Sequence, residues 1–261
     1  MVKQTILSAN ISIGSYNEFI RKIFDLSNCN KSSYVVFANV HMLVSAYQDR
    51  QFNEVVNQAD LAAPDGRPLS LFLRVAEGIR QPRVCGMDLL PDLMAEAARL
   101  QKSVFFYGTT EKILTKIVQR IHREHPTLNV AGTYSPPFRA LSTDEKNAVI
   151  DMINNARPDL VLVSLGCPKQ EKWMAEHKGK INSCMLGLGQ AFNTYAGVER
   201  RLPIWMRNLS LEWMYRLYRE PRRLWKRYLY TNTLFVMLAF RFFFNRWLSQ
   251  QRFQFAQKKS R

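Results

Sequence analysis

The chain has 261 residues, of which 47% are hydrophobic, and a formal net charge of +16 at pH 7. These values are those of an ordinary globular protein, with room for one large α/β domain or for a domain plus an appendage. The first 14 residues hold short apolar runs and no small-residue cleavage site, which argues against a secretory signal. The four cysteines, Cys29, Cys85, Cys167 and Cys184, form no CxxC pair, so we expect free thiols in a reducing cytoplasm.

Up to about residue 188, short apolar runs alternate with amphipathic helical stretches. We expect strands at Tyr34–Asn39, Ser103–Tyr107, Leu128–Gly132, Asp159–Leu165 and Ser183–Leu188. We expect helices near Ser15–Ser27, Met87–Leu100, Glu111–Glu124 and Thr143–Ala156. Two helix starts carry a capping box, Ser15-x-x-Glu18 and Ser142-x-x-Glu145. Continuous apolar strands between helices favour a mainly parallel sheet covered on both faces, and hence an α/β, Rossmann-like core.

Residues 200–261 differ in composition from the rest of the chain. They hold 15 Lys and Arg against 2 Glu, so +13 of the total charge of +16 lies there. Leu209–Arg219 is predicted to be a helix, Pro221 to end it or to begin the next, and Leu224–Leu248 to be a second, aromatic-rich helix. We therefore expect a core over residues 1–200 and a basic, aromatic, α-helical appendage over residues 201–261. Such a basic block usually faces phosphate groups of nucleic acids, anionic lipids or diphosphates.

Four exits from apolar runs carry residues suited to chemistry, and ligands of parallel α/β sheets bind at the carboxyl ends of the strands. The candidate residues at these exits are Asn39 and His41, Asp65, Gly108, and Gln170 with Glu171. Each also has a purely structural interpretation: Asn39 as a helix cap, Asp65 as a turn residue before Gly66, and Gly108 as a loop glycine. Gly108 also opens a predicted helix, whose free N–H groups are suited to holding an anion.

Several common nucleotide-binding motifs are absent from the sequence. No GxGxxG or Walker A pattern occurs, which argues against dinucleotide oxidoreductases and P-loop NTPases. No Asp-x-Asp pair occurs either, so no metal ion is expected to bridge a nucleotide diphosphate and no cofactor is expected. Phosphate charge would then be met by Arg, Lys and backbone N–H groups.

Six short motifs occur in a fixed order between about Ser33 and Tyr228. They are Phe37-Ala38-Asn39-Val40-His41, Ala63-Pro64-Asp65-Gly66, Arg83-Val84-x-Gly86-x-Asp88, Val104-Phe105-Phe106-Tyr107-Gly108, Gly166-x-Pro168-Lys169-Gln170-Glu171 and Leu211-Glu212-Trp213-x-Tyr215-Arg216-Leu217. Together they resemble the WecG/TagA/CpsF family of inverting glycosyltransferases. The family often has Thr two residues before the Asn, where this chain has Phe37, so the resemblance does not name the donor sugar.

The resemblance implies a nucleotide-sugar donor, an undecaprenyl-diphosphate-linked sugar acceptor and metal-independent inversion. It implies that Asp65 is the general base and that Asn39, Arg83 and Gln170 lie in the sugar pocket. Gly108 and Glu171, at the strand exits, are further candidates for substrate binding. It also implies that basic residues of the appendage hold the diphosphate, namely Arg216, Arg219, Arg222 and Arg223. For the donor, the resemblance implies a UDP-sugar of the N-acetylmannosamine, mannosaminuronate or glucose type.

Two other classes of function fit parts of the pattern. A basic aromatic segment also suits a nucleic-acid-binding protein, although Leu234–Phe240 is too apolar for a solvated basic arm. In a noncatalytic membrane-surface scaffold, Asp65 would be only a turn residue. Turnover of a nucleotide sugar would separate the glycosyltransferase from both, and we expect no nucleic-acid partner.

The appendage is predicted to lie on the membrane rather than to span it. Its longest charge-free run, Tyr228–Phe240, has 13 residues, whereas a spanning helix needs about 20 apolar residues. Aromatic side chains at headgroup depth and basic side chains near anionic lipid suit a peripheral helix. We expect the protein at the cytoplasmic face of the bacterial inner membrane. A homo-oligomer is compatible with the sequence, which does not indicate an oligomeric state.

Overall fold

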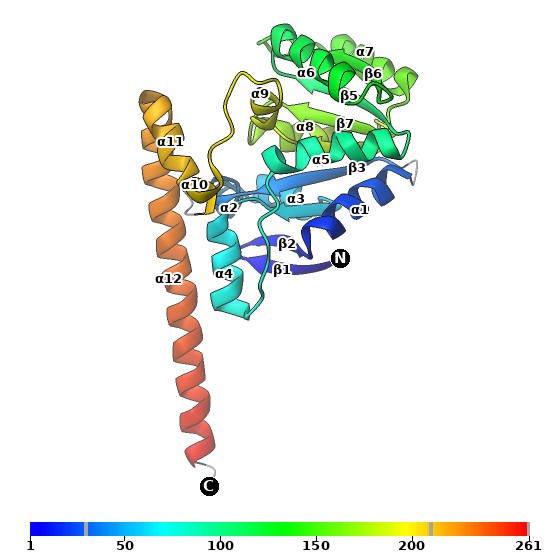
Figure 1. Cartoon of the computed structure of the whole chain (residues 1–261). Coiled ribbons are helices and arrows are strands. Elements are labelled where there is room, and N and C mark those ends of the chain that lie inside the picture. The colour runs from blue at the N-terminus through cyan, green and yellow to red at the C-terminus, as the bar shows by residue number, and fades with distance from the viewer. Residues whose placement is uncertain (29–30, 209–210, 260–261) are drawn as a thin grey trace.

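The computed structural model describes the backbone of residues 1–28, 31–208 and 211–259, and their side chains except those of residues 208, 223 and 249–259. In this part of the chain a sheet of six parallel strands has the order β4–β3–β8–β7–β5–β6 (Figure 1). The strands are β3 (Ser33–Ala38), β4 (Leu61–Pro64), β5 (Ser103–Gly108), β6 (Asn129–Tyr134), β7 (Leu160–Ser164) and β8 (Cys184–Gly187). The predicted α/β, Rossmann-like class with a mainly parallel sheet is confirmed.

Helices cover both faces of this sheet. Successive strand residues point to opposite sides, so each strand contributes side chains to two apolar cores. Tyr34 and Val36 of β3 belong to one apolar core, and Val35 and Phe37 belong to the other. The first core packs against α2 (Val40–Gln48), α3 (Arg50–Asn57), α4 (Arg67–Glu77), α7 (Thr143–Ala156) and α8 (Lys169–His177). The second packs against α1 (Tyr16–Asn28), α5 (Gly86–Arg99), α6 (Glu111–Glu124) and α9 (Ala191–Tyr195).

The strands and helices predicted before residue 200 coincide with observed ones to within about two residues, whereas the helix predicted at Leu224–Leu248 extends over Pro221–Lys259. Both predicted capping boxes form: the Glu18 carboxylate accepts from Ser15 N at 2.6 Å, and Glu145 accepts from Ser142 N at 2.8 Å. Three strands were not predicted: β4 and the antiparallel hairpin of β1 (Val2–Ile6) and β2 (Ala9–Ile13). Strand β2 lies beside the edge strand β4, where the Ser12 hydroxyl accepts from Ala62 N at 3.1 Å.

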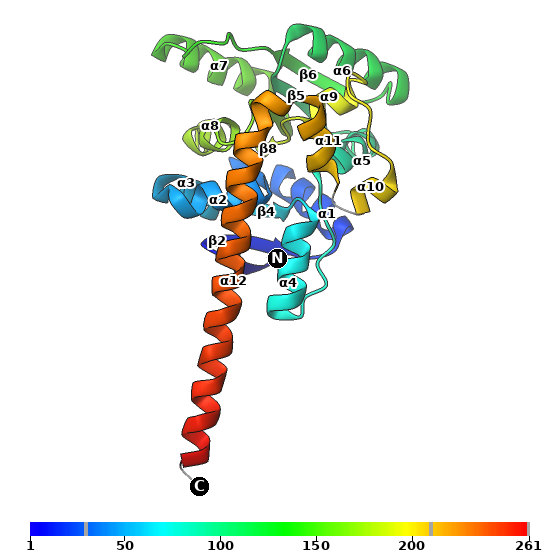
Figure 2. The ribbon, with the colours of Figure 1, turned by 90° about the vertical axis from the view of Figure 1, so that its left-hand side faces the viewer.

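The C-terminal segment consists of α10 (Ile204–Asn208), α11 (Glu212–Arg219) and α12 (Pro221–Lys259), which confirms a helical appendage in which Pro221 begins a helix. The predicted start of α11 at Leu209 lies outside the described residues. Helix α12 packs along α2 and beside α4, burying Leu224, Thr231 and Phe235, and then continues past the core (Figures 1 and 2). A domain boundary at residue 200 stays a prediction.

Aromatic rings hold α12 against α4. The ring of Phe72 in α4 lies 6.3 Å from that of Phe235, 5.2 Å from Phe242 and 5.5 Å from Phe243, measured between centroids. Farther along α12, Arg246 forms an ion pair of 3.0 Å with Glu77 at the end of α4. The appendage is thus packed against α2 and α4 of the core from Leu224 to Arg246.

Candidate active site

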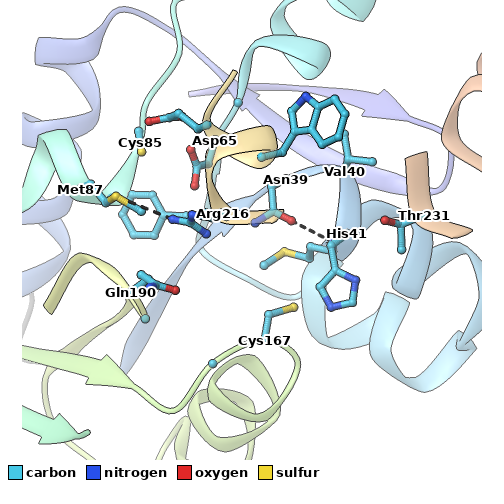
Figure 3. Close-up of a pocket in the computed structure, with 18 of the residues that line it drawn as sticks. Asn39, Val40, His41, Asp65, Cys85, Met87, Cys167, Gln190, Arg216 and Thr231 are labelled. Atoms are coloured by element: carbon cyan, nitrogen blue, oxygen red, sulfur yellow. Dashed lines mark hydrogen bonds between the residues drawn. The ribbon is translucent and has the colours of Figure 1, made fainter. Parts of the chain in front are cut away.

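A cavity of about 450 Å³ lies at the carboxyl ends of the central strands. Its floor comes from residues that follow β3, β4, β7 and β8, and its far wall comes from α11 and α12. The sheet order reverses here, because the chain passes from β3 to β4 on one side and later fills the other side. This is the place where doubly wound α/β sheets bind their ligands. Figure 3 shows the side chains that face the cavity.

Asp65 is placed by the end of β4. Its backbone N–H donates to the Ala38 carbonyl of β3 at 2.7 Å, which fixes the turn. Gly66 follows with a φ of +116°, a conformation that suits glycine, and α4 begins at the next residue. The carboxylate therefore sits on a rigid turn facing the cavity (Figure 3).

Burial raises the pKa of the Asp65 carboxyl to about 6. The thiol of Cys85 donates to this carboxylate and lowers the pKa, the negative charge of Glu212 raises it, and Arg83 and Arg216 lower it. A carboxylate with a pKa close to neutral accepts a proton more readily than an ordinary one and is still charged at pH 7. The pKa of Asp65 thus suits a general base.

The pKa of Asp65 predicts the acid limb of the pH profile. If Asp65 acts as a carboxylate, kcat/KM should fall about tenfold per pH unit below pH 6 and level off above it. The variant Cys85→Ala should move this limb to higher pH, because the thiol hydrogen bond lowers the pKa. Measuring kcat/KM between pH 4.5 and 8 for both proteins checks this. A profile that stays flat down to pH 5 would contradict the assignment.

Arg83 lines the cavity, but two carboxylates bind its guanidinium group. It pairs with Asp88 at 2.8 Å and with Glu212 at 2.9 Å. Arg201 bridges the same two carboxylates, at 2.8 Å to Asp88 and 2.6 Å to Glu212, and Arg207 pairs with Asp88 at 2.6 Å. This network fastens the appendage to the loop before α5. Arg83 therefore holds Glu212 in place and has its charge largely compensated.

Asn39 and Gln170 face the cavity while bonding to the protein. The Asn39 side chain caps α2 by accepting from Met42 N at 3.1 Å, so its structural interpretation also holds. The Gln170 amide donates to the Gly187 carbonyl and to Glu171, both at 2.8 Å, and accepts from Gly166 N at 3.2 Å. Gln170 thus fixes the ends of β7 and β8. Glu171 is fully buried, and burial raises the pKa of its carboxyl.

The other end of the cavity contains His41, Cys167 and Arg227. Burial, together with the charge of Arg227, lowers the pKa of His41 to about 4, so its imidazole is neutral at pH 7. Among the described side chains, the buried His41 Nδ1 and Arg227 Nε have no hydrogen-bond partner. Thr231, one turn beyond Arg227 on α12, completes this wall. Arg227 was not among the predicted site residues.

The four arginines that were predicted to hold the diphosphate do not all lie at the cavity. Arg216 lines the cavity and donates to the Met87 sulfur at 3.8 Å. Arg219 and Arg222 are exposed and do not line the cavity, and the side chain of Arg223 lies outside the described residues. Within the described part of the chain, neither Arg216 nor Arg227 pairs with a carboxylate. These two arginines are therefore available for an anionic ligand.

Gly108 does not line the cavity either. Its φ is +108°, and a Cβ there would lie 2.3 Å from the Ser164 carbonyl oxygen of β7. A glycine is needed because β5 and β7 approach closely at this point. Strand β5 lies on the far side of β7 from β3, so its exit opens away from the cavity.

No group of three or more His, Cys, Asp or Glu side chains that could hold a metal ion occurs among the described residues. The cysteines Cys85, Cys167 and Cys184 are free thiols, and Cys29 lies outside the described residues. No described helix is long and apolar enough to cross a membrane.

Comparison with known proteins identifies the family. A sequence profile described as "Glycosyl transferase WecG/TagA/CpsF family" matches residues 4–249. The chain belongs to this glycosyltransferase family. The resemblance of the six motifs is thereby confirmed, and the cavity at the strand ends is the candidate active site of a transferase.

Three similar proteins share the name N-acetylglucosaminyldiphosphoundecaprenol N-acetyl-beta-D-mannosaminyltransferase. The protein of Bacillus subtilis strain 168 is 32% identical over 192 residues, which cover 73% of each chain. That of Bacillus spizizenii is 32% identical over 201 residues, or 77% of this chain and 76% of the relative. That of Staphylococcus aureus strain MW2 is 26% identical over 207 residues, or 78% of each chain.

Proposed function

We propose that this protein transfers a sugar from a UDP-sugar to a sugar linked to polyprenyl diphosphate, at the cytoplasmic face of the bacterial inner membrane. The observation that carries the proposal is the placement of the desolvated Asp65 carboxylate in one cavity with Arg216 and Arg227. The names of the relatives support a lipid-linked acceptor and an N-acetylmannosamine-type donor. Donors of the mannosaminuronate and glucose types are tested in parallel.

In this proposal Asp65 acts as the base of a single inverting displacement. The acceptor hydroxyl oxygen attacks the anomeric carbon while the bond from that carbon to the diphosphate oxygen breaks. The hydroxyl proton passes to the Asp65 carboxylate, and the nucleoside diphosphate leaves with the bonding electron pair. Asn39 lies between the Asp65 and His41 ends of the cavity, where its amide can orient a sugar (Figure 3).

The leaving diphosphate gains negative charge during this step, and fixed guanidinium groups can stabilise that charge. Arg216 of α11 and Arg227 of α12 face the cavity without a carboxylate partner among the described residues. Arg83 is less suited to this role, because Asp88 and Glu212 already bind its guanidinium group. We therefore assign diphosphate binding to Arg216 and Arg227 and expect no need for a divalent metal.

A transfer assay tests the proposal. The purified protein would be incubated with UDP-linked N-acetylmannosamine, mannosaminuronate or glucose and with N-acetylglucosaminyl diphosphate linked to a prenyl chain. We expect one donor to yield an inverted disaccharide product, and the rate to persist in EDTA. Product with retained configuration would overturn the role of Asp65. A strict requirement for Mg²⁺ or Mn²⁺ would overturn the role given to the arginines, and no product with any donor would overturn the proposed function.

The exposed part of α12 supports a peripheral membrane location. Phe240, Phe244 and Trp247 are 70%, 48% and 53% exposed, and Arg241 lies among them. Aromatic rings of this kind insert at headgroup depth, and basic side chains near an anionic leaflet each gain about 1 kcal/mol.

This location predicts the effect of surface substitutions on vesicle binding. The double variant Phe244→Ser/Trp247→Ser should bind anionic phospholipid vesicles at least about tenfold more weakly, because the lost apolar contact is worth more than about 1.4 kcal/mol. Tyr218→Ser, which removes an 84% exposed ring from α11, is the matched control and should bind normally. Cosedimentation at low and high salt measures both. Equal binding of the native protein, the double variant and Tyr218→Ser would contradict the membrane location.

A further inference from the structure

An apolar groove of about 480 Å³ lies between α4 and α12. Leu71, Phe72 and Val75 form the α4 side, and Phe235, Val236, Ala239 and Phe243 form the α12 side. The two helices lie side by side in both views of the molecule (Figures 1 and 2). Phe72 is the buried floor, whereas Leu71, Val75 and Val236 are 58%, 62% and 64% exposed. An exposed apolar surface of this kind marks a site for a ligand, a membrane or another protein.

The groove is continuous with the candidate active site. Five residues line both spaces: Val40, Arg67, Pro68, Trp213 and Asn232. Helix α4 begins directly after the Asp65–Gly66 turn, so the groove starts beside the proposed base and runs along α4 away from it. Its residues on α4, Pro68, Leu71, Phe72 and Val75, recur at helical spacing on one face. A ligand held at Asp65 can therefore extend an apolar tail along this face.

The geometry points to the prenyl chain of the acceptor as the occupant of this groove. The inference rests on the proposed function, which supplies an acceptor with a polar sugar diphosphate and an apolar tail. The acceptor sugar fits the cavity beside Asp65, where Arg216 and Arg227 are assigned to the donor diphosphate. The apolar tail fits the adjoining groove, whose lining is mostly hydrocarbon. Beyond Phe243, the last residue of α12 that lines the groove, the exposed rings of Phe244 and Trp247 follow on the same helix.

The length of the groove sets how much of the chain it holds. From Arg67 to Val75, α4 rises about 12 Å at 1.5 Å per residue. An isoprene unit has four chain bonds of about 1.5 Å, so roughly two or three units fit along this distance. The groove thus holds the units next to the diphosphate and leaves the rest of the chain for the bilayer.

The test compares acceptors that differ only in the tail. N-acetylglucosaminyl diphosphate would be linked either to farnesol, with three isoprene units, or to ethanol. For the native protein we expect kcat/KM to be at least about tenfold higher with the farnesyl acceptor, since burying a single isoprene unit exceeds 1.4 kcal/mol. Val75→Glu and Val236→Glu should reduce this ratio to about one, because a carboxylate cannot share a groove with hydrocarbon.

Met237→Glu is the matched control. Met237 is the next residue on α12, is 62% exposed and does not line the groove, so its substitution adds the same charge at the same depth. This variant should keep the preference for the farnesyl acceptor. An unchanged ratio in Val75→Glu and Val236→Glu, or no preference in the native protein, would overturn the inference.

A binding measurement keeps this test independent of turnover. Farnesyl diphosphate, titrated calorimetrically into the native protein and into Met237→Glu, should bind at least about tenfold more tightly than to Val236→Glu. If this holds while no donor is turned over, the groove is supported and the proposed function fails. If the native protein is a dimer that Val236→Glu dissociates, the groove is a subunit interface and the inference is overturned.

Discussion

Replacing Asp65 by Asn should lower kcat by about 10²–10⁴-fold, the usual effect of losing a general base. Asn has nearly the same shape and can still accept from the Cys85 thiol, so the turn and the cavity should persist. It cannot take the proton of the acceptor hydroxyl. Among the described residues that line the cavity, the other two carboxylates are already engaged: Glu212 pairs with Arg83 and Arg201, and Glu171 is fully buried and accepts from Gln170. Steady-state rates at saturating donor and acceptor measure this. An Asp65→Asn protein with near-native turnover would end the assignment.

The same substitution should stabilise the fold at neutral pH. The Asp65 carboxyl has a pKa of about 6 in the folded protein against an ordinary value of 3.8, so the folded state binds the proton more tightly than the unfolded chain. The charged group therefore destabilises the fold above pH 6, and this penalty disappears below pH 4. Asn removes the penalty. We expect the free energy of unfolding to rise by about 1 kcal/mol at pH 7.5, less than the full shift implies because the side chain retains some solvent contact.

Urea unfolding at pH 7.5 and at pH 4 checks the sign, since the gain should be present at the first pH and absent at the second. Cys85→Ala is a control that alters the same contact without removing the base. It should remain active at pH 8, with its acid limb shifted to higher pH. A destabilised Asp65→Asn protein would instead indicate that the carboxylate has a structural role.

Local sequence signals predicted much of this fold. The capping boxes at Ser15 and Ser142 and the apolar run of β7 depend on neighbouring residues alone, and these elements occur where expected. Strand β4 was not predicted because it has only four residues and is built from Leu, Ala and Pro, a composition without strand character. Its exit residue Asp65 was still identified, because a turn signal marks the end of the apolar run.

The candidate site was harder to predict where it depends on strand order. All parallel strands end at one edge of the sheet, so Gly108 and Asn39 are equivalent by sequence. The order β4–β3–β8–β7–β5–β6 places the exit of β5 away from that of β3, and Gly108 therefore serves close strand packing. Nothing in the local sequence reveals that order, since strand neighbours are set by long-range packing of the helices.

The arginines of the appendage depend on a similar long-range feature. Sequence alone gives a cluster of arginines around Pro221, whereas the face of α12 that meets the core is set by long-range packing. The docking of α12 on α2 buries Leu224, Thr231 and Phe235, and the same face carries Arg227 to the cavity. A spacing signal was present, because Arg227 and Thr231 lie one turn apart and Leu224 and Phe235 flank them on the same side.

Arg227→Met and Arg216→Met should each lower kcat/KM by about 10²–10³-fold, with most of the loss in kcat. The reason is that a fixed donor aimed at developing charge is worth this much in a site shielded from water. Met keeps the length and apolar stem of the side chain, so the packing of α12 should survive. Transfer kinetics with one donor and one acceptor measure the effect, and vesicle binding should stay within about twofold for both variants.

Arg219→Met and Arg222→Met are the matched controls, because they remove the same charge from exposed positions of α11 and α12 outside the cavity. Each should change kcat/KM by less than about threefold, as is usual for surface substitutions. The contrast between the two pairs separates a specific diphosphate site from a general electrostatic attraction. If all four variants lose activity equally, and lose vesicle binding in parallel, the arginines act through the membrane surface and the cavity has no diphosphate site of its own. If Arg227→Met alone is inactive, the charge of the leaving group is met at the His41 end of the cavity, and Arg216 instead serves to tune the pKa of Asp65.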